Sequence, residues 1–245
     1  MKITVTESEA EFDIAAGWRL VTQMLAKPQA VIGLSTGQTT IGLHGVASRI
    51  FKSAPFDVSG ITVFNVDELI HIPRNYQGSC YSRILDQLVA PLGISTENFV
   101  MPATVASDFQ SECLAFEQDL HSRGGVDLQL LGIGLNGHIG LNQPGTPFER
   151  ETWVSKLEPE LEERLKKGAN IADGVQLEGI TRGIKNIMQS RKLILLAKGA
   201  HKAEIVARAL YGPVSTALPA SVVQLHPDCE ILLDRAAAAM IRPQG

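Results

Sequence analysis

Short apolar segments alternate with amphipathic segments along most of this chain, and this alternation constrains its fold more than any other feature. Continuous apolar runs bounded by polar residues are typical of strands that are buried on both faces of a parallel sheet. Such strand-like runs occupy residues 30–34, 60–66, 126–134, 192–199 and 229–234, with a weaker one at 97–102. Patterns of helical periodicity occupy residues 7–25, 39–51, 79–88, 108–121, 201–210 and 235–240.

Strands that alternate with helices predict an α/β fold, in which an open, mostly parallel sheet carries helices on both faces. The chain has 245 residues, 44% of them hydrophobic, which is enough to bury the core of one large domain. We therefore expect a single Rossmann-like domain over residues 1–245.

A charged segment at residues 156–174 interrupts this alternation. It is either a solvated helix on the surface or a lid that carries charge over a binding site. Its composition favours the surface helix, and the lid remains the alternative.

The overall charge excludes several classes of function. The formal net charge is −4, so the chain lacks the basic footprint of a nucleic-acid-binding protein, and an anionic ligand would need a local positive site. The N-terminal segment lacks the apolar stretch of a signal peptide, and no apolar run reaches the length of about 18 residues that a membrane span needs. Cys80, Cys113 and Cys229 are far apart in the sequence, as reduced thiols would be. We expect a cytoplasmic protein that binds neither nucleic acid nor membrane.

Ligands of open parallel sheets bind beyond the carboxyl ends of the strands, so the loops that follow the strands are the first candidates for a site. The first such loop contains Ser35, Thr36, Gly37, Gln38 and Thr39 and runs directly into a helix. Small residues at a helix N-terminus leave backbone N–H groups that can bind an anion. The loop lacks the lysine of a Walker A motif, and the alternative is an ordinary helix cap.

Two adjacent carboxylates, Asp67 and Glu68, follow the second strand. A carboxyl group in a crowded, partly apolar setting has its pKa raised toward neutrality, which makes it a candidate general base. Alternatively, the pair could bind a metal, or one of the two could cap the next turn.

A glycine-rich loop at residues 130–147 contains a formal G-x-G-x-x-G at Gly132, Gly134 and Gly137. It does not fit a dinucleotide-binding loop, because two further glycines and two prolines follow and no helix can continue there. The glycines are better explained by tight turns that let the backbone approach a ligand.

The same loop holds His138 among Asn136, Asn142 and Gln143. These amides can orient an imidazole and a polyhydroxyl substrate, and a histidine in such a loop is a candidate for function as well as for structure. Lys202 falls in the first turn of a later helix, where an anionic ligand would explain a cation that otherwise opposes the helix dipole. The alternative for Lys202 is a solvated surface lysine, and we read residues 215–228 as a buried structural turn.

Five sequence motifs of this chain resemble those of a known family. The chain resembles the glucosamine-6-phosphate deaminase/isomerase family, relatives of the 6-phosphogluconolactonases, over nearly its whole length. The motifs stand in the order of the family: LSTGQTT at 34–40, FNVDEL at 64–69, GIGLNGHIGLNQPG at 132–145, KGAHKA at 198–203 and LPASVVQLHP at 218–227.

Members of this family convert an amino-sugar 6-phosphate to fructose 6-phosphate and ammonia without metal or coenzyme. The resemblance therefore implies a small phosphosugar as partner, and it implies that Asp67 moves a proton between C2 and C1 while His138 assists ring opening at O5. It places the phosphate on the loop at 35–39 together with Lys202.

The resemblance extends to further residues. A second phosphate-binding cation would come from the lid-like segment, where Lys167, or Lys166, is the nearest match. Asn136 lies where members carry Asp or Asn, and Gly137 is assigned to the substrate-binding loop.

Gln143 departs from the family pattern, because members carry at this position a glutamate that partners the histidine. An amide does not favour the imidazolium as a carboxylate does, so ring opening is impaired or the sugar differs, for example galactosamine 6-phosphate. The alternatives are a lactonase-type hydrolase and a divergent sugar-phosphate-binding protein. The basic residues of allosterically activated members are not evident at 146–155, so we expect no activation by N-acetyl amino sugar. Separately, we expect a monomer or a small homo-oligomer.

Overall fold

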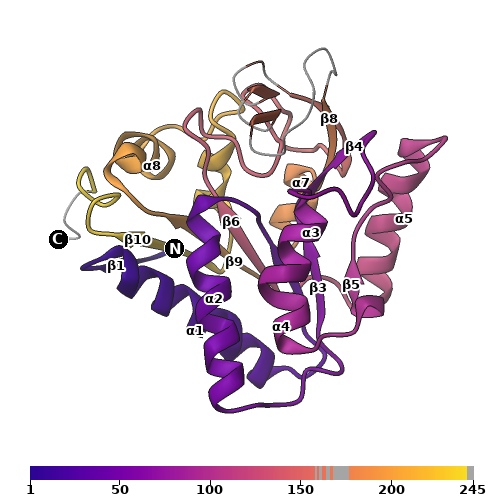
Figure 1. Cartoon of the computed structure of the whole chain (residues 1–245). Coiled ribbons are helices and arrows are strands. Elements are labelled where there is room, and N and C mark those ends of the chain that lie inside the picture. Colours follow the sequence, from indigo (N-terminus) through magenta and orange to yellow (C-terminus); the bar gives the residue numbers. More distant parts are fainter. Residues whose placement is uncertain (158, 160–161, 164–165, 168–176, 242–245) are drawn as a thin grey trace.

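A seven-stranded, wholly parallel sheet forms the centre of the molecule (Figure 1). The structure is a computed structural model that describes residues 1–157, 159, 162–163, 166–167 and 177–241. In spatial order the strands are β1 (Lys2–Thr6), β10 (Cys229–Asp234), β9 (Lys192–Ala197), β6 (Leu128–Gly132), β2 (Val31–Leu34), β3 (Thr62–Asn65) and β5 (Phe99–Val100). The predicted parallel α/β fold is confirmed.

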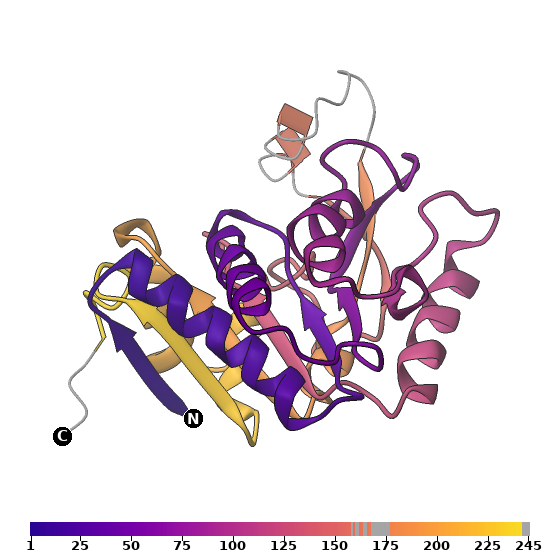
Figure 2. The same ribbon diagram turned by 60° about the horizontal axis from the view of Figure 1, so that its bottom comes forward.

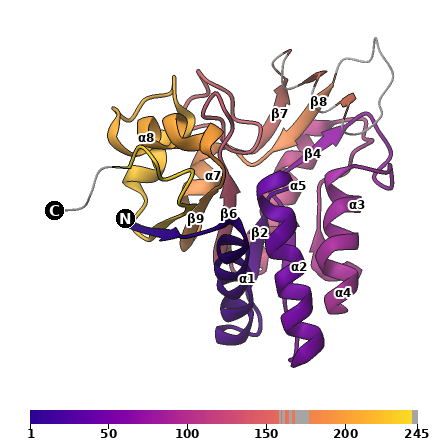
Figure 3. The ribbon, with the colours of Figure 1, turned by 60° about the vertical axis from the view of Figure 1, so that its left-hand side comes forward.

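Helices cover both faces of this sheet (Figures 2 and 3). One face carries α1 (Glu9–Ala26), α2 (Gln38–Ser53), α3 (Cys80–Ile84), the π-helical turn η1 (Leu85–Val89) and α4 (Ala90–Leu92). The other face carries α5 (Phe109–Ser122), α7 (Ile184–Met188), α8 (Ala203–Tyr211) and the 3₁₀ helix η4 (Pro219–Leu225). None of the helices in the described part of the chain is long and apolar enough to cross a membrane.

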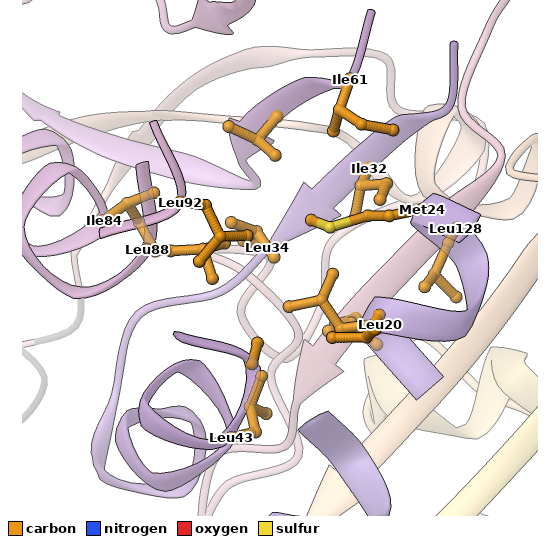
Figure 4. Packing of buried hydrophobic residues seen from close by; sticks show 14 of the residues in the cluster. Leu20, Met24, Ile32, Leu34, Leu43, Ile61, Ile84, Leu88, Leu92 and Leu128 are labelled. Atoms are coloured by element: carbon orange, nitrogen blue, oxygen red, sulfur yellow. The ribbon is translucent and has the colours of Figure 1, made fainter. Parts of the chain in front are cut away.

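The two faces are built by alternate residues of each strand. In β9, Ile194 and Leu196 pack with α1 and α2, whereas Leu193, Leu195 and Ala197 pack with α7 and α8. Figure 4 shows the first of these cores. Because both faces are buried, the strands read as continuous apolar runs instead of alternating patterns, as the sequence indicated. Burial of each large aliphatic side chain contributes about 1.5–3 kcal/mol to this packing.

Two hydrogen bonds similar to those of a capping box fix the start of α1. The hydroxyl of Ser8 accepts a hydrogen bond from the backbone N–H of Glu11 at 3.2 Å, and the Glu11 carboxylate accepts one from the N–H of Glu7 at 3.1 Å. Two otherwise unsatisfied N–H groups are thereby paired, which typically stabilises a helix by about 1 kcal/mol.

The sequence did not predict a second, antiparallel sheet of three short strands. Its order is β4 (Asp67–Ile70), β8 (Glu178–Thr181) and β7 (Trp153–Lys156). Asp67 pairs with Thr181, so the candidate base begins a strand instead of lying in an irregular loop. The small sheet lies beyond the carboxyl ends of β2 and β6 (Figure 3).

Residues 235–240 form turns, and the helix predicted there is wrong. The carboxylate of Asp234 accepts hydrogen bonds from the backbone N–H groups of Ala237 at 2.7 Å and Gly199 at 3.0 Å. Six residues are too few to form a stable helix without strong packing. The strand β1 and helix α7 were also not predicted, and the segment at 215–228, where the sequence indicated a buried turn, contains η4, which is buried from Pro219 to Val223. Most of the segment at 156–174 lies outside the described residues, so its interpretation as a lid or a surface helix stays a prediction.

The order of the strands places a ligand crevice between β2 and β6. From β2 the chain runs outward through β3 to β5, and it then returns to place β6 on the other side of β2. The loops after β2 and β6 therefore diverge at the carboxyl edge, which is where open α/β sheets bind ligands.

Candidate active site

A cleft of about 390 Å³ opens at this carboxyl edge and is lined by the loops that follow β2, β3, β6 and β9. The structure brings together in it most of the residues expected from the sequence: Ser35, Thr36, Gly37, Gln38, Thr39, Asp67, His138 and Lys202. Four others, Asn136, Gly137, Gln143 and Lys167, are not among the described residues that line the cleft.

The loop after β2 offers backbone groups to a ligand, and the hydroxyls of Ser35 and Thr40 are engaged within the protein. Ser35 Oγ donates to the carbonyl of Leu130 at 2.9 Å, and Thr40 Oγ1 donates to the carbonyl of Ser35 at 2.8 Å. No described side chain caps the first turn of α2, which begins after Gly37. An anion at this terminus would accept hydrogen bonds from the N–H groups of that turn.

Lys202 provides a positive charge on the β9 side of the cleft. It ends the 3₁₀ turn η3 (Ala200–Lys202), which leads into α8, and only 9% of the residue is exposed. Its Nζ donates to the carbonyl of Ile133 at 2.6 Å. A buried ammonium group is costly unless it has charged or polar partners, so an anionic ligand would stabilise this arrangement.

Asp67 is the candidate base. Asn65 Nδ2 donates to the Asp67 carbonyl at 2.6 Å and to its Oδ1 at 3.2 Å, and Cys80 Sγ lies 3.6 Å from the same carboxylate oxygen. Burial, followed by the negative charge of Glu68, raises the pKa of Asp67 to about 7, although the bonds from Cys80 and Asn65 oppose the rise. Near neutral pH the carboxyl group is therefore divided between its two forms, as a reversible proton carrier requires.

Glu68 has a different role from its neighbour. Its side chain is fully buried, and Oε1 accepts from the N–H groups of Leu69 at 2.9 Å and Cys80 at 3.0 Å, while Oε2 accepts from Tyr81 N–H at 2.6 Å. Burial raises the pKa of Glu68, and these bonds oppose the rise. Glu68 therefore accepts hydrogen bonds from the first N–H groups of α3 beside the cleft, whereas Ser79 is the N-cap of that helix.

His138 is oriented by Asn136. Asn136 Oδ1 lies 2.7 Å from His138 Nδ1 and also accepts the backbone N–H of His138 at 3.1 Å. An amide oxygen at this distance favours a proton on Nδ1, which leaves Nε2 as the acceptor in the neutral imidazole. His138 can then take up a proton at Nε2 and return it.

The sequence suggested that Gln143 is a direct partner of the imidazole, but Asn136 lies between the two side chains. Its Oε1 accepts from Asn136 Nδ2 at 3.0 Å, and only 8% of the residue is exposed. The order is therefore His138, Asn136, Gln143, so Gln143 influences the imidazole through Asn136.

Gly137 shapes the loop that carries His138. Its φ of 85° lies in the left-handed region, and a Cβ there would collide with the side chain of Leu218. Its carbonyl accepts from Ala220 N–H at 2.9 Å, and Gly134 N–H donates to the carbonyl of His138 at 2.9 Å. These contacts give Gly137 a structural role, and the substrate contact expected for it stays a prediction.

Lys166 and Lys167 form ion pairs within their own segment. Lys167 Nζ lies 2.7 Å from Glu163, with its side chain 75% exposed, and Lys166 Nζ lies 2.8 Å from Glu162. Sequence reasoning missed Arg83 and Cys80, which do line the cleft. The only sequence signal for them was their spacing of three within the helical pattern at 79–88, which places both on one side of a helix.

Comparisons with known proteins show the family of this chain. The family model for glucosamine-6-phosphate isomerases and 6-phosphogluconolactonase matches residues 15–231. The glucosamine-6-phosphate deaminase of Clostridium botulinum (strain Kyoto / Type A2) is 35% identical over 241 residues, which cover 98% of this chain and 99% of the relative. The glucosamine-6-phosphate deaminase of Thermoanaerobacter pseudethanolicus is 34% identical, with coverage of 98% and 95%.

Solved structures give the same result. A glucosamine-6-phosphate deaminase described as monomeric superposes with a TM-score of 0.93 at 33% identity, covering 98% of this chain and 100% of the other. The 6-phosphogluconolactonase from Trypanosoma cruzi superposes with a TM-score of 0.78 at 19% identity, covering 98% and 96%, which shows a shared fold. The chain belongs to the family of glucosamine-6-phosphate isomerases and 6-phosphogluconolactonases.

Proposed function

We propose that this protein is a hexosamine-6-phosphate deaminase that isomerises an amino-sugar 6-phosphate and releases ammonia. The observation that carries the proposal is the meeting, in one cleft, of Asp67 with a pKa of about 7, His138, and an anion-binding loop with Lys202. Full-length relatives at 34–35% identity are named glucosamine-6-phosphate deaminases, which supports the same reaction.

The proposed reaction begins with phosphate binding and ring opening. The 6-phosphate lies on the first turn of α2 with Lys202, which directs C1 and C2 toward Asp67. His138 Nε2 takes the proton of the anomeric hydroxyl and delivers it to O5, so that the ring C1–O5 bond breaks and the open-chain amino aldehyde forms. Asn136 keeps the imidazole in the tautomer that can begin this transfer.

Proton transfer follows at the other end of the cleft. Ionised Asp67 removes the proton from C2 while O1 of the aldehyde takes up a proton from the ammonium group of the substrate, giving an enol that carries a neutral amino group on C2. Asp67 then delivers its proton to C1, and the product is the iminium ion of a 2-ketose with a primary alcohol at C1. Addition of water to the C2 iminium ion and loss of ammonium yield the ketohexose 6-phosphate. Atoms and charges balance with water as the only co-substrate.

Ammonia release from a panel of compounds tests this function. We expect release from glucosamine 6-phosphate or galactosamine 6-phosphate, at least 10²-fold weaker turnover of the free amino sugars, and no rate enhancement for hydrolysis of 6-phosphogluconolactone. Each charge-assisted hydrogen bond to the phosphate contributes roughly 1.5–3 kcal/mol, which accounts for the loss with free sugars. Lactone hydrolysis without ammonia release would establish the lactonase-type reaction instead.

A further inference from the structure

The substrate phosphate needs more positive charge than Lys202 alone supplies. A phosphate monoester is close to a dianion at neutral pH. The same cleft contains Asp67 and Glu68, which disfavour an anion nearby. The two lysines of the 156–174 segment that could provide a second cation, Lys166 and Lys167, pair with neighbouring glutamates.

Arg83 is a further cation that lines this cleft, together with the loop at 35–40. It lies three residues after Cys80 in α3, so both side chains leave the same side of the helix. Cys80 Sγ is 3.0 Å from Thr36 Oγ1, which places this side of α3 directly against the loop. The charge of Arg83 also acts on the Cys80 thiol, lowering a pKa that burial and two carboxylates raise.

The other arginine of this region is committed to the fold. Arg74 donates to the carbonyls of Met101 at 3.1 Å and Pro102 at 3.2 Å and lies over the ring of Tyr81. It is not among the described residues that line the cleft. Arg83, in contrast, lines the cleft.

We infer that Arg83 binds the 6-phosphate of the substrate, opposite Lys202, and supplies the second cation of the phosphate site. The inference rests on the proposed function for the identity of the phosphosugar. Lys202 follows β9, whereas α3 follows β3, and these two strands flank β6 and β2 in the sheet. The phosphate is thus held between a lysine on one side and a guanidinium on the other, with the N-terminus of α2 between them. The planar guanidinium can donate two parallel bonds to phosphate oxygens, which a lysine cannot do.

Arg83→Gln, Arg83→Lys and the control Arg208→Gln test this inference. Arg208 lies on α8, with its side chain 61% exposed, and its replacement removes the same charge outside the cleft. We expect Arg83→Gln to raise KM for the hexosamine 6-phosphate about 10–100-fold and to leave kcat within about threefold, because the phosphate is remote from the reacting atoms. Arg83→Lys should raise KM about two- to tenfold, and Arg208→Gln should not change it.

Binding of fructose 6-phosphate and of inorganic phosphate, measured by calorimetry, separates this inference from the proposed reaction. If Arg83→Gln weakens both ligands but the wild-type protein releases no ammonia from any hexosamine 6-phosphate, the phosphate site is right and the reaction is wrong. If ammonia is released and both Arg83 variants bind both ligands as tightly as wild type, the inference is wrong and the reaction stands. Should Arg83→Gln fail to fold, Arg83→Lys decides, since unchanged affinity in that variant contradicts the bidentate contact.

Discussion

Asp67 titrates in the range where this enzyme would work, and its activity should follow that titration. The ionised form is the base, and burial together with Glu68 raises the pKa of Asp67 to about 7. We therefore expect kcat/KM to rise about tenfold per pH unit from pH 5 and to level off above about pH 7. A profile that is flat between pH 5 and 8 would contradict Asp67 as the base.

Glu68→Gln should move this profile to lower pH, because it removes the negative neighbour that raises the pKa of Asp67. The variant keeps one oxygen for the N–H groups of Leu69 and Cys80 and loses the bond from Tyr81, so it should fold with reduced stability. A folded variant whose pH profile matches wild type would show that the Glu68 charge does not act on the base.

The same pKa predicts a pH-dependent stability. The folded state favours the neutral carboxyl, so the stabilisation is complete below the ordinary pKa of an aspartate and is lost as pH rises through about 7. Asp67→Asn should therefore have the same melting temperature as wild type at pH 4 and a higher melting temperature than wild type at pH 8. The difference should be roughly 1–2 kcal/mol, since the half-buried side chain is screened at the cleft.

Gln143 acts on His138 through Asn136, and Gln143→Glu tests that arrangement. A carboxylate that contacts Asn136, which itself contacts His138, favours the charged form of the imidazole. We therefore expect the acid limb of the pH–rate profile to shift and kcat on a pyranose substrate to rise about two- to tenfold. Lower activity would instead assign Gln143 to substrate specificity. If neither kcat nor the pH–rate profile changes, the loop from Asn136 to Gln143 does not lie at the sugar site.

At the scale of elements, the loop after β6 depends on a contact with the segment before η4. Gly137→Ala should destabilise the protein by roughly 1–3 kcal/mol, because alanine is strained at φ 85° and its Cβ meets Leu218. The measurement is thermal unfolding together with kcat, which should fall as His138 shifts. Adding Leu218→Ala removes the collision, so the double variant should regain part of the lost activity, whereas a single variant as stable as wild type would contradict the packing.

Elements with a local signal could be predicted from the sequence, and elements defined by distant partners could not. Strands such as β9 are marked by uninterrupted apolar residues because both their faces are buried. The strands β4, β7 and β8 have four residues each, and β8 pairs with β4 across more than a hundred positions and with β7 across more than twenty, so nothing in the sequence indicated them. The positions of Asp67 and His138 at the carboxyl edge of the sheet followed from the strands that precede them, but the contact between Asn136 and the imidazole required coordinates, since it depends on side-chain direction.

Arg83 illustrates the same limit at the site. Its segment was predicted as a helix, but only the fold shows that Glu68 binds the first N–H groups of that helix and that Cys80 packs on Thr36. These contacts place the helix beside the cleft, and helical periodicity alone could not indicate them.

For the whole molecule, we predict that a second phosphosugar does not activate the enzyme. The prediction depends on the surface formed by the segment that follows the catalytic loop. In the segment at 146–155, Arg150 lies over the Trp153 ring, and Glu151 pairs with Lys185 at 2.6 Å. A surface whose cations are engaged in this way is a poor site for a phosphate. N-acetylglucosamine 6-phosphate should therefore leave kcat and KM unchanged and the saturation curve hyperbolic, and a sigmoidal curve that the ligand makes hyperbolic would contradict this.

Solvent deuterium incorporation by wild type and Asp67→Asn tests the central claim most directly, namely that Asp67 carries the proton between C2 and C1. In D₂O, wild type should convert the hexosamine 6-phosphate to a ketose phosphate with deuterium at C1, followed by NMR. In Asp67→Asn this rate should fall roughly 10²–10⁴-fold, while fructose 6-phosphate binds within about tenfold of wild type, because the amide keeps the shape but cannot accept the proton. Incorporation at the wild-type rate in Asp67→Asn would contradict the account.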